Sequence, residues 1–323
     1  MNETEFIKEL RTGNFTILKQ VYGGNSSVFK ASNEDNETFA IKKYRGEESR
    51  IQRMLARENS AITFLKLNNV ENIPEVVELR RDLGVIVYRW IDGESPDSNF
   101  DSMSAIIDMC KLLSNLNVKS SIVEPAIDAA FSLADIKIQI QERISAMEST
   151  YSNPIIWEIC NHLRERLRVC PSKSFVFMPD TLSISDLGVH NILAHEKSYT
   201  FIDFEFFGID SVVKMVGDFL LHPRNEFDSK QMLRFIDSIS DCSNWDHREL
   251  ISVIPLLTLK WSVIAFGRLF RESSGSTNAV FSREVIYGSV GFNYLRYFDE
   301  YRQRHFDGSF QTFRSFADTL AIS

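Results

Sequence analysis

The chain has 323 residues, too many for one small core, and their number fits two lobes or domains. Hydrophobic residues make up 44% and charged residues 25%, which excludes a disordered or fibrous chain. The net charge of −8 argues against non-specific nucleic-acid binding. Four scattered cysteines without a Cys-x-x-Cys pair predict reduced thiols of a cytoplasmic protein and argue against a disulfide framework or a zinc site.

The first ninety residues alternate apolar and polar side chains in the manner of β-strands. The periodicity predicts three strands, one helix and two further strands, at residues 15–22, 27–31, 39–44, 48–67, 76–80 and 85–90. Strand periodicity stops at Ile91-Asp92-Gly93, which is expected to be a short connector. The acidic, amphipathic start of the chain is not expected to be a signal peptide.

The remainder of the chain has mainly helical spacing. Three helices are expected, then three short strands, at residues 103–116, 129–147, 154–169, 175–178, 191–194 and 199–204, with helices again from about residue 212. The most apolar stretch, 250–266, is interrupted by Pro255 and Lys260 and is expected to be a buried helix, not a membrane span. The sequence therefore predicts a strand-rich lobe at 1–90, a hinge at 91–94 and a helical lobe at 95–323.

Negative charge is concentrated in the second lobe. Residues 1–92 contain 14 of the 36 basic and 14 of the 44 acidic residues, so the whole excess of acidic residues lies in 93–323. This pattern is explained either by an acidic solvated surface or by an acidic cleft that attracts a cationic substrate. The sequence does not choose between the two.

A small polar turn between the first two expected strands has residue types that suit a phosphate. It consists of Gly23, Gly24, Asn25, Ser26 and Ser27. Glycines let backbone amides approach phosphate oxygens closely, and hydroxyl groups add donors. A Gly-Gly hairpin turn without any ligand is the alternative interpretation.

The strand near residue 41 presents a small residue and a lysine on one face. Ala40 and Lys42 share this face, while Lys43 points to the other. Ala40 leaves room for the flat base of a nucleotide, and Lys42 can then reach its phosphates; Lys43 would do so if the register differs by one. The alternative interpretation of Lys42 is a solvated lysine on an edge strand. Glu58, on the following helix, either pairs with Lys42 or lies on the surface beside neighbouring arginines.

The strongest signal lies between residues 184 and 205. Asp186 is followed five residues later by Asn191 at the start of an apolar strand, and Asp203 closes the next apolar strand. A hairpin would bring Asn191 and Asp203 side by side, and their oxygens are ligands of the kind that Mg²⁺ takes when it also holds phosphates. Asp186, left free of the metal, can accept a proton from a substrate hydroxyl.

Together these residues resemble the aminoglycoside phosphotransferase and choline-kinase-like enzymes, which are relatives of the protein kinases in fold. The resemblance covers about residues 18–223 and depends on the loops quoted above. It implies a phosphate-binding loop at 23–27, a strand lysine paired with a helix glutamate, a catalytic Asp186 and a magnesium site at Asn191 and Asp203. It also implies a hinge at 88–93 that receives the adenine, with Tyr88 and Trp90 among the nucleotide-binding residues.

The resemblance implies an α+β, protein-kinase-like bilobal fold and a small-molecule kinase that uses ATP and Mg²⁺. The acceptor would be a hydroxyl of a sugar, amino sugar, aminoglycoside or amino alcohol, and the acidic second lobe fits a cationic one. No nucleic-acid or membrane partner is expected. Asp218 is expected to brace the catalytic loop, and His222 to be structural.

The catalytic loop departs from the family pattern at Ile184 and Ser185, where the family has His and Gly. The departure supports an alternative, a catalytically silent nucleotide-binding scaffold, although every polar residue that the chemistry needs is retained. A protein kinase is the less favoured alternative, because Glu205 follows Asp203-Phe204 and no Ala-Pro-Glu segment is present.

Overall fold

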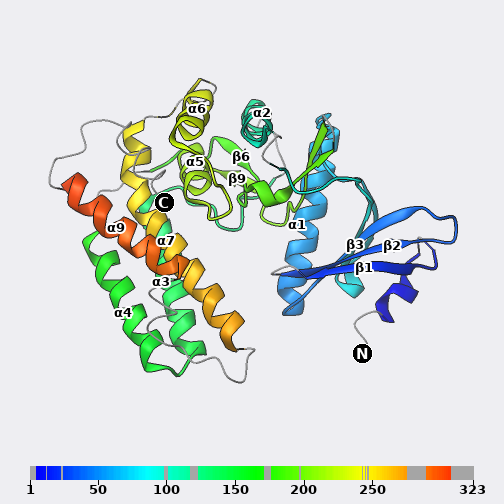
Figure 1. The fold of residues 1–323 in the computed structure, drawn as a ribbon, viewed down its shortest axis with the longest axis horizontal. Helices are drawn as coiled ribbons and strands as arrows, with labels where there is room; N and C mark the ends of the chain where they lie inside the picture. The colour runs from blue at the N-terminus through cyan, green and yellow to red at the C-terminus, as the bar shows by residue number, and fades with distance from the viewer. Residues whose placement is uncertain are drawn as a thin grey trace. The chain divides into compact units, whose positions relative to one another are not determined.

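The computed structural model describes residues 5–11, 13–22, 25–97, 101–116, 123–170, 176–195, 198–241, 243, 245, 247–274 and 289–306. Within these ranges an antiparallel sheet and a larger set of helices confirm the α+β class (Figure 1). The chain forms two compact units. The first comprises Met1–Ala105, Leu116–Ile127 and Gly188–Gly208, and the second Ile106–Asn115, Asp128–Leu187 and Ile209–Ser323.

A five-stranded antiparallel sheet forms the centre of the first unit. Its strands are β1 (Thr16–Tyr22), β2 (Ser26–Ser32), β3 (Thr38–Tyr44), β4 (Val76–Arg80) and β5 (Val85–Arg89), in the order β1-β2-β3-β5-β4. The 3₁₀ helix η1 (Glu5–Glu9) covers one face, where Phe6 and Ile7 pack against Phe29 and Ile41. Alternation along β3 turns Lys42 to the opposite face, towards the helix α1 (Glu48–Leu67).

A hairpin from late in the chain belongs to the same unit. The 3₁₀ turn η4 (Val189–Asn191) leads into β7 (Ile192–His195), which pairs with β8 (Ser198–Phe201). An isolated bridge joins Ala194 to Glu94, and the Phe201 amide donates to the Asn72 carbonyl at 2.9 Å. These bonds fix the hairpin to the strand-rich unit despite its distance along the sequence.

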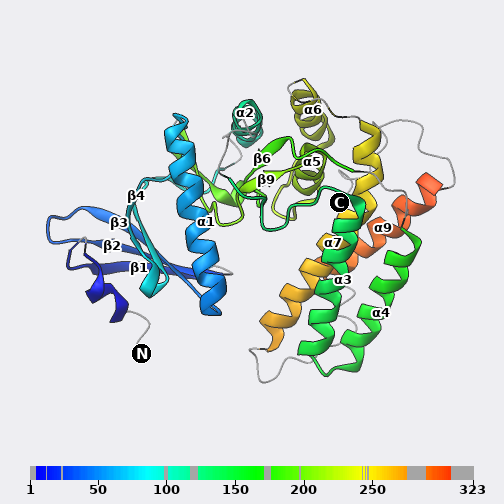
Figure 2. The same ribbon diagram turned by 180° about the vertical axis from the view of Figure 1, so that it is seen from behind.

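The second unit is mainly helical. Its elements are α2 (Ser102–Asn115, which begins in the first unit), α3 (Leu133–Thr150), α4 (Pro154–Val169), α5 (Val212–Leu221), α6 (Ser229–Ser240), α7 (His247–Ser274) and α9 (Val290–Phe306), with the short strand β6 (Thr181–Ser183). β6 pairs with β9 (Gly208–Asp210), which spans the boundary of the units. Figure 2 shows α7 beside α3, α4 and α9, with which it makes contacts.

Local sequence signals set where these helices begin. Ser132 accepts a hydrogen bond from the Asp135 amide at the start of α3, and Ser211 does the same for α5. α6 begins with a capping box between Asp228 and Gln231. Such caps satisfy amide groups that have no partner within the helix.

The strand expected at 175–178 is not formed. Residue 175 lies outside the described residues, and Val176 makes only an isolated bridge to Ser132. Phe177 is buried while Val176 and Met178 are exposed. One apolar side chain of this segment therefore packs in the core, although the segment forms no strand. The ordered strand of this region is β6, five residues further along.

The long helix α7 runs through Pro255 and Lys260, which were expected to interrupt the apolar stretch. Among the described residues, its stretch Arg248–Arg271 is long and apolar enough to cross a membrane by length and composition alone. In that stretch 67% of the most apolar window is buried within the protein. This burial is typical of a core helix.

Candidate active site

Lys42 lies at the centre of a buried cluster of charged groups in the first unit. Its Nζ lies 2.9 Å from Oε2 of Glu58 and 2.7 Å from Oδ1 of Asp203. Oε2 of Glu205 is 3.2 Å away. Burial alone would lower the pKa of Lys42, but the Asp203, Glu58 and Glu205 carboxylates outweigh it and hold that pKa well above its ordinary value. The predicted pair between Lys42 and Glu58 is therefore present, and the ammonium stays charged.

Tyr44 fixes the glutamate of this pair. Ala40, Lys42 and Tyr44 lie two residues apart on β3 and so share one face. The Tyr44 hydroxyl donates to Oε2 of Glu58, whose residue is only 2% exposed. The sequence reasoning did not include Tyr44, although the same alternation that selected Lys42 also indicates it.

The hairpin joins the backbone of Asn191 to Ile202, the residue before Asp203. The Ile202 amide donates to the Asn191 carbonyl at 2.9 Å. Asp203 has a φ of 68°, in the left-handed region that is uncommon outside glycine and tolerated by Asp. Backbone strain of this kind costs about 1–3 kcal/mol and is found preferentially at functional sites. The Asp203 side chain is 34% exposed, whereas Asn191 is buried.

Glu205 is the acidic residue of this site that the sequence reasoning did not select. The Asn25 side-chain amide donates to its Oε1 at 2.8 Å. Its buried Oε2 lies 3.2 Å from Lys42 Nζ but receives no hydrogen bond from the described residues. Burial raises the pKa of Glu205 to about 7 and Asp203 adds to the rise, although Lys42 opposes it. The signal that could have found it is the Asp-x-Glu spacing after the second strand of the hairpin.

The donor set fits a hard divalent cation. Glu58, Asp203 and Glu205 each offer a carboxylate oxygen, and these atoms lie within 4.8 Å of one another. Three carboxylates surround one ammonium, and the buried Glu205 oxygen still has an unused lone pair. Mg²⁺ takes oxygen ligands and commonly binds one or two carboxylates together with phosphates.

The other residues expected to contact the nucleotide are placed as follows. Gly23 and Gly24 lie outside the described residues, while Ser26 and Ser27 are the first two residues of β2 and are buried. Tyr88 pairs with the half-buried Ala40 in the β3–β5 ladder, on the face that carries Lys42. After the end of β5, the Trp90 amide still bonds to the Thr38 carbonyl, so the expected hinge continues directly from the sheet.

Asp186 belongs to the second unit and lies in a loop that is bonded to the end of α5. Oδ1 of Asp186 lies 2.9 Å from Nε2 of His222. The Asn225 side-chain amide donates to the Leu187 carbonyl at 3.1 Å and to the Phe219 carbonyl at 3.0 Å. Ser185, just before Asp186, has a φ of 66°, so the loop passes through a left-handed turn without a glycine.

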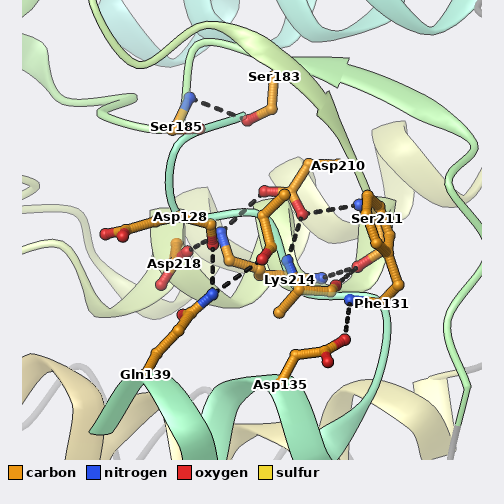
Figure 3. Close-up of polar contacts among 12 residues, drawn as sticks. Asp128, Phe131, Asp135, Gln139, Ser183, Ser185, Asp210, Ser211, Lys214 and Asp218 are labelled. Atoms are coloured by element: carbon orange, nitrogen blue, oxygen red, sulfur yellow. Dashed lines mark hydrogen bonds and ion pairs between the residues drawn. The ribbon is translucent and has the colours of Figure 1, made fainter. Parts of the chain in front are cut away.

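Asp218, expected to brace the catalytic loop, reaches it only through other side chains, Trp261 and His222. Among the described residues no hydrogen bond joins Asp218 to residues 184–187. Instead it accepts bonds from Lys214 Nζ at 2.8 Å and from Trp261 Nε1 at 3.1 Å. Figure 3 shows the Lys214 amine bonded also to Asp210. Asp218 is therefore part of a buried ion cluster, while His222 and Asn225 hold the loop.

Comparison with known proteins places this geometry in a known fold. No protein-family model and no curated protein matches the chain. Among solved structures, choline kinase LicA from Streptococcus pneumoniae is similar over 92% of this chain and 96% of its own, with a TM-score of 0.58 and 16% identity. The chain has the fold of choline kinases and aminoglycoside phosphotransferases.

Two further structures support this conclusion. Choline kinase from Cryptosporidium parvum has a TM-score of 0.56 at 13% identity, over 96% of this chain and 95% of its own. Spectinomycin phosphotransferase, in complex with ADP and spectinomycin, has a TM-score of 0.55 at 14% identity, over 100% of this chain and 98% of its own. The protein-kinase-like fold expected from the sequence is thereby confirmed.

Proposed function

We propose that the protein is a Mg-ATP-dependent small-molecule kinase that transfers the γ-phosphoryl group of ATP to a hydroxyl. A fold alone does not set a function, so the proposal depends on the site. The observation that carries it is the buried Lys42 ammonium, which contacts Glu58 of α1 and the strained Asp203 of the hairpin. This combination suits a nucleoside triphosphate and a cation, and the similar structures include complexes with ADP and AMP.

The residues of the first unit would bind and orient the nucleotide. Lys42, held by Glu58, would donate to phosphate oxygens, and the loop proposed at 23–27 would bind them. Asn191, Asp203 and Glu205 would hold Mg²⁺, which when bound neutralises charge on the phosphates. Ala40, Tyr88 and Trp90 would line the place of the base, within the lobe proposed at 1–90 and its hinge at 91–94.

Asp186 would act on the acceptor as a general base. Its carboxylate accepts the hydroxyl proton while the hydroxyl oxygen forms a bond to the γ-phosphorus and the bond to the leaving ADP oxygen breaks. A base of this kind contributes about 10²- to 10⁴-fold. The acceptor would bind the helical lobe proposed at 95–323, and the excess of acidic residues in 93–323 favours a cationic amino alcohol, amino sugar or aminoglycoside in the cytoplasm.

A catalytically silent scaffold is the second candidate, and the loop residues Ile184 and Ser185 favour it. The two functions differ in turnover. The deciding experiment measures Mg²⁺-dependent ATP consumption across sugars, amino sugars, aminoglycosides and amino alcohols. We expect acceptor-dependent turnover that Asp186→Asn lowers at least about 100-fold without loss of ATP affinity.

Two variants complete the design. Asp237→Asn, an exposed carboxylate on α6, makes the same chemical change in the same unit and should leave turnover unchanged. Asp203→Ala should abolish Mg²⁺-dependent nucleotide binding in a titration. ATP binding that persists in the wild type without turnover on any acceptor would favour the scaffold, and an unchanged Asp203→Ala titration would remove this residue from the metal site.

A further inference from the structure

We propose that His222 positions the carboxylate of Asp186, through a hydrogen bond from its Nε2. The inference deepens the proposed function, because it assumes that Asp186 is the base. His222 was expected to be structural, as the residue that ends α5 before a proline. The structure instead directs its ring at the one carboxylate of the second unit that the chemistry needs.

The neighbouring bonds specify which ring nitrogen carries the proton. The Arg224 backbone amide donates to Nδ1 of His222 at 3.1 Å, so Nδ1 is an acceptor. In a neutral imidazole the proton then lies on Nε2, and this N–H faces Oδ1 of Asp186 at 2.9 Å. His222 is consequently a donor to Asp186 and does not compete with it for the substrate proton.

The ring is itself held in place. His222 is 6% exposed and packs edge-on against Trp261, with ring centroids 5.0 Å apart and planes at 80°. The Trp261 indole N–H donates to Asp218, which Lys214 holds from the other side. A continuous series of packed and bonded groups therefore leads from the buried Lys214 to Asp186. Side chains locked in this way hold a reactive group in a productive orientation.

The loop needs this support because its backbone is strained. Ser185 adopts a left-handed φ of 66°, and the Asp186 side chain is 32% exposed. A carboxylate on such a loop would rotate freely unless one of its oxygens were bonded. With Oδ1 held by His222, rotation of the Asp186 carboxylate is restricted. Misplacement of a reacting group by 1 Å can cost about 100-fold in rate.

The kinetic experiment compares His222→Ala with His222→Gln, since the Gln side-chain amide can reproduce the Nε2 donor. We expect His222→Ala to lower kcat about 10- to 100-fold, with the KM for ATP changed less than about threefold. His222→Gln should recover most of the lost kcat. His162→Ala, at an exposed histidine on α4 of the same unit, should have no effect. Full activity of folded His222→Ala would overturn the inference.

A second measurement does not depend on turnover or on the stability of the alanine variant. Long-range ¹H–¹⁵N spectra of the wild type should show the Nε2–H tautomer of His222, with a signal that shifts in Asp186→Asn. An Nδ1–H tautomer would overturn the inference. The two proposals fail differently. Absence of turnover on every acceptor overturns the proposed kinase function, and with it the positioning role of His222 towards Asp186. Turnover that is lost in Asp186→Asn but normal in His222→Ala overturns the positioning role alone.

Discussion

Replacing Lys214 with methionine should destabilise the protein strongly, and by more at high pH. Lys214 is 1% exposed, and its Nζ lies 2.8 Å from both Asp210 Oδ2 and Asp218 Oδ2 (Figure 3). Lys260 Nζ, 3.8 Å from Asp218, partly replaces the lost ammonium there. Asp210 has no second cation among the described residues and keeps only the backbone amides of Ala130 and Ser211.

The magnitude follows from the burial of these carboxylates. Removing one partner of a buried ion pair costs about 3–5 kcal/mol, because the remaining charge is left uncompensated. For a chain of this size that corresponds to a fall in Tm of about 6–15 °C. Lys214→Met combined with Asp210→Asn should recover part of the loss, since it removes the stranded charge. Lys230→Met, an exposed lysine on α6, is the matched control and should leave Tm unchanged.

The pH dependence has a definite sign. In the wild type burial would raise the pKa of Asp218, but Lys214 and Lys260 hold it below its ordinary value. Asp218 therefore stabilises the fold at a pH above the pKa that it has in the unfolded chain. This contribution is lost as the pH falls through the lower pKa of the folded state. In Lys214→Met the ammonium no longer opposes the effect of burial, so the pKa of the buried carboxylates rises. The folded variant then binds protons on these carboxylates that the unfolded chain releases. Thermal unfolding should show a larger Tm difference at pH 8 than at pH 5, and a small or pH-independent difference would refute the reasoning.

Three further predictions concern the candidate site and the packing. Lys42→Met should weaken ATP binding about 10- to 100-fold in a titration, since a hydrogen bond to a charged group contributes about 1.5–3 kcal/mol. Lys43→Met, on the other face of β3, should leave ATP binding unchanged. Equal effects of the two substitutions would contradict the assigned register. Gly208→Ala should lower Tm, because its Cβ would lie 2.4 Å from the Ala126 nitrogen. Gly267→Ala, whose Cβ meets nothing closer than 4.0 Å, should stabilise α7 by about 0.5–1 kcal/mol, and a loss of stability there would contradict the packing.

Local patterns predicted much of the strand-rich unit. The helix expected at 48–67 coincides with α1, and each of the five expected strands lies within about two residues of its observed bounds. The register that separates Lys42 from Lys43 was also predictable, because one face of β3 must pack against apolar neighbours. Such features depend on periodicity over a few residues, which the sequence carries directly.

Other features depended on partners far along the chain. The apolar alternation at 175–178 forms only an isolated bridge, and Asp218 bonds to Lys214 and Trp261 and not directly to the catalytic loop. Glu205 and Tyr44 are adjacent in sequence to residues that were selected, yet only the folded arrangement shows that they contact the same ion cluster. The roles of Asp186, Asn191 and Asp203 in catalysis stay predictions.

The sequence by itself determined the fold class and the residue types of the site, because hydrophobic periodicity and the spacing of polar residues between strands are local properties. Only the tertiary structure decided which side chains hold those residues in place. Lys42 meets Glu205, which follows it by more than 160 positions, and His222 meets Asp186 across 36. Contacts of this kind depend on how helices and strands pack, and no short stretch of sequence encodes the partner.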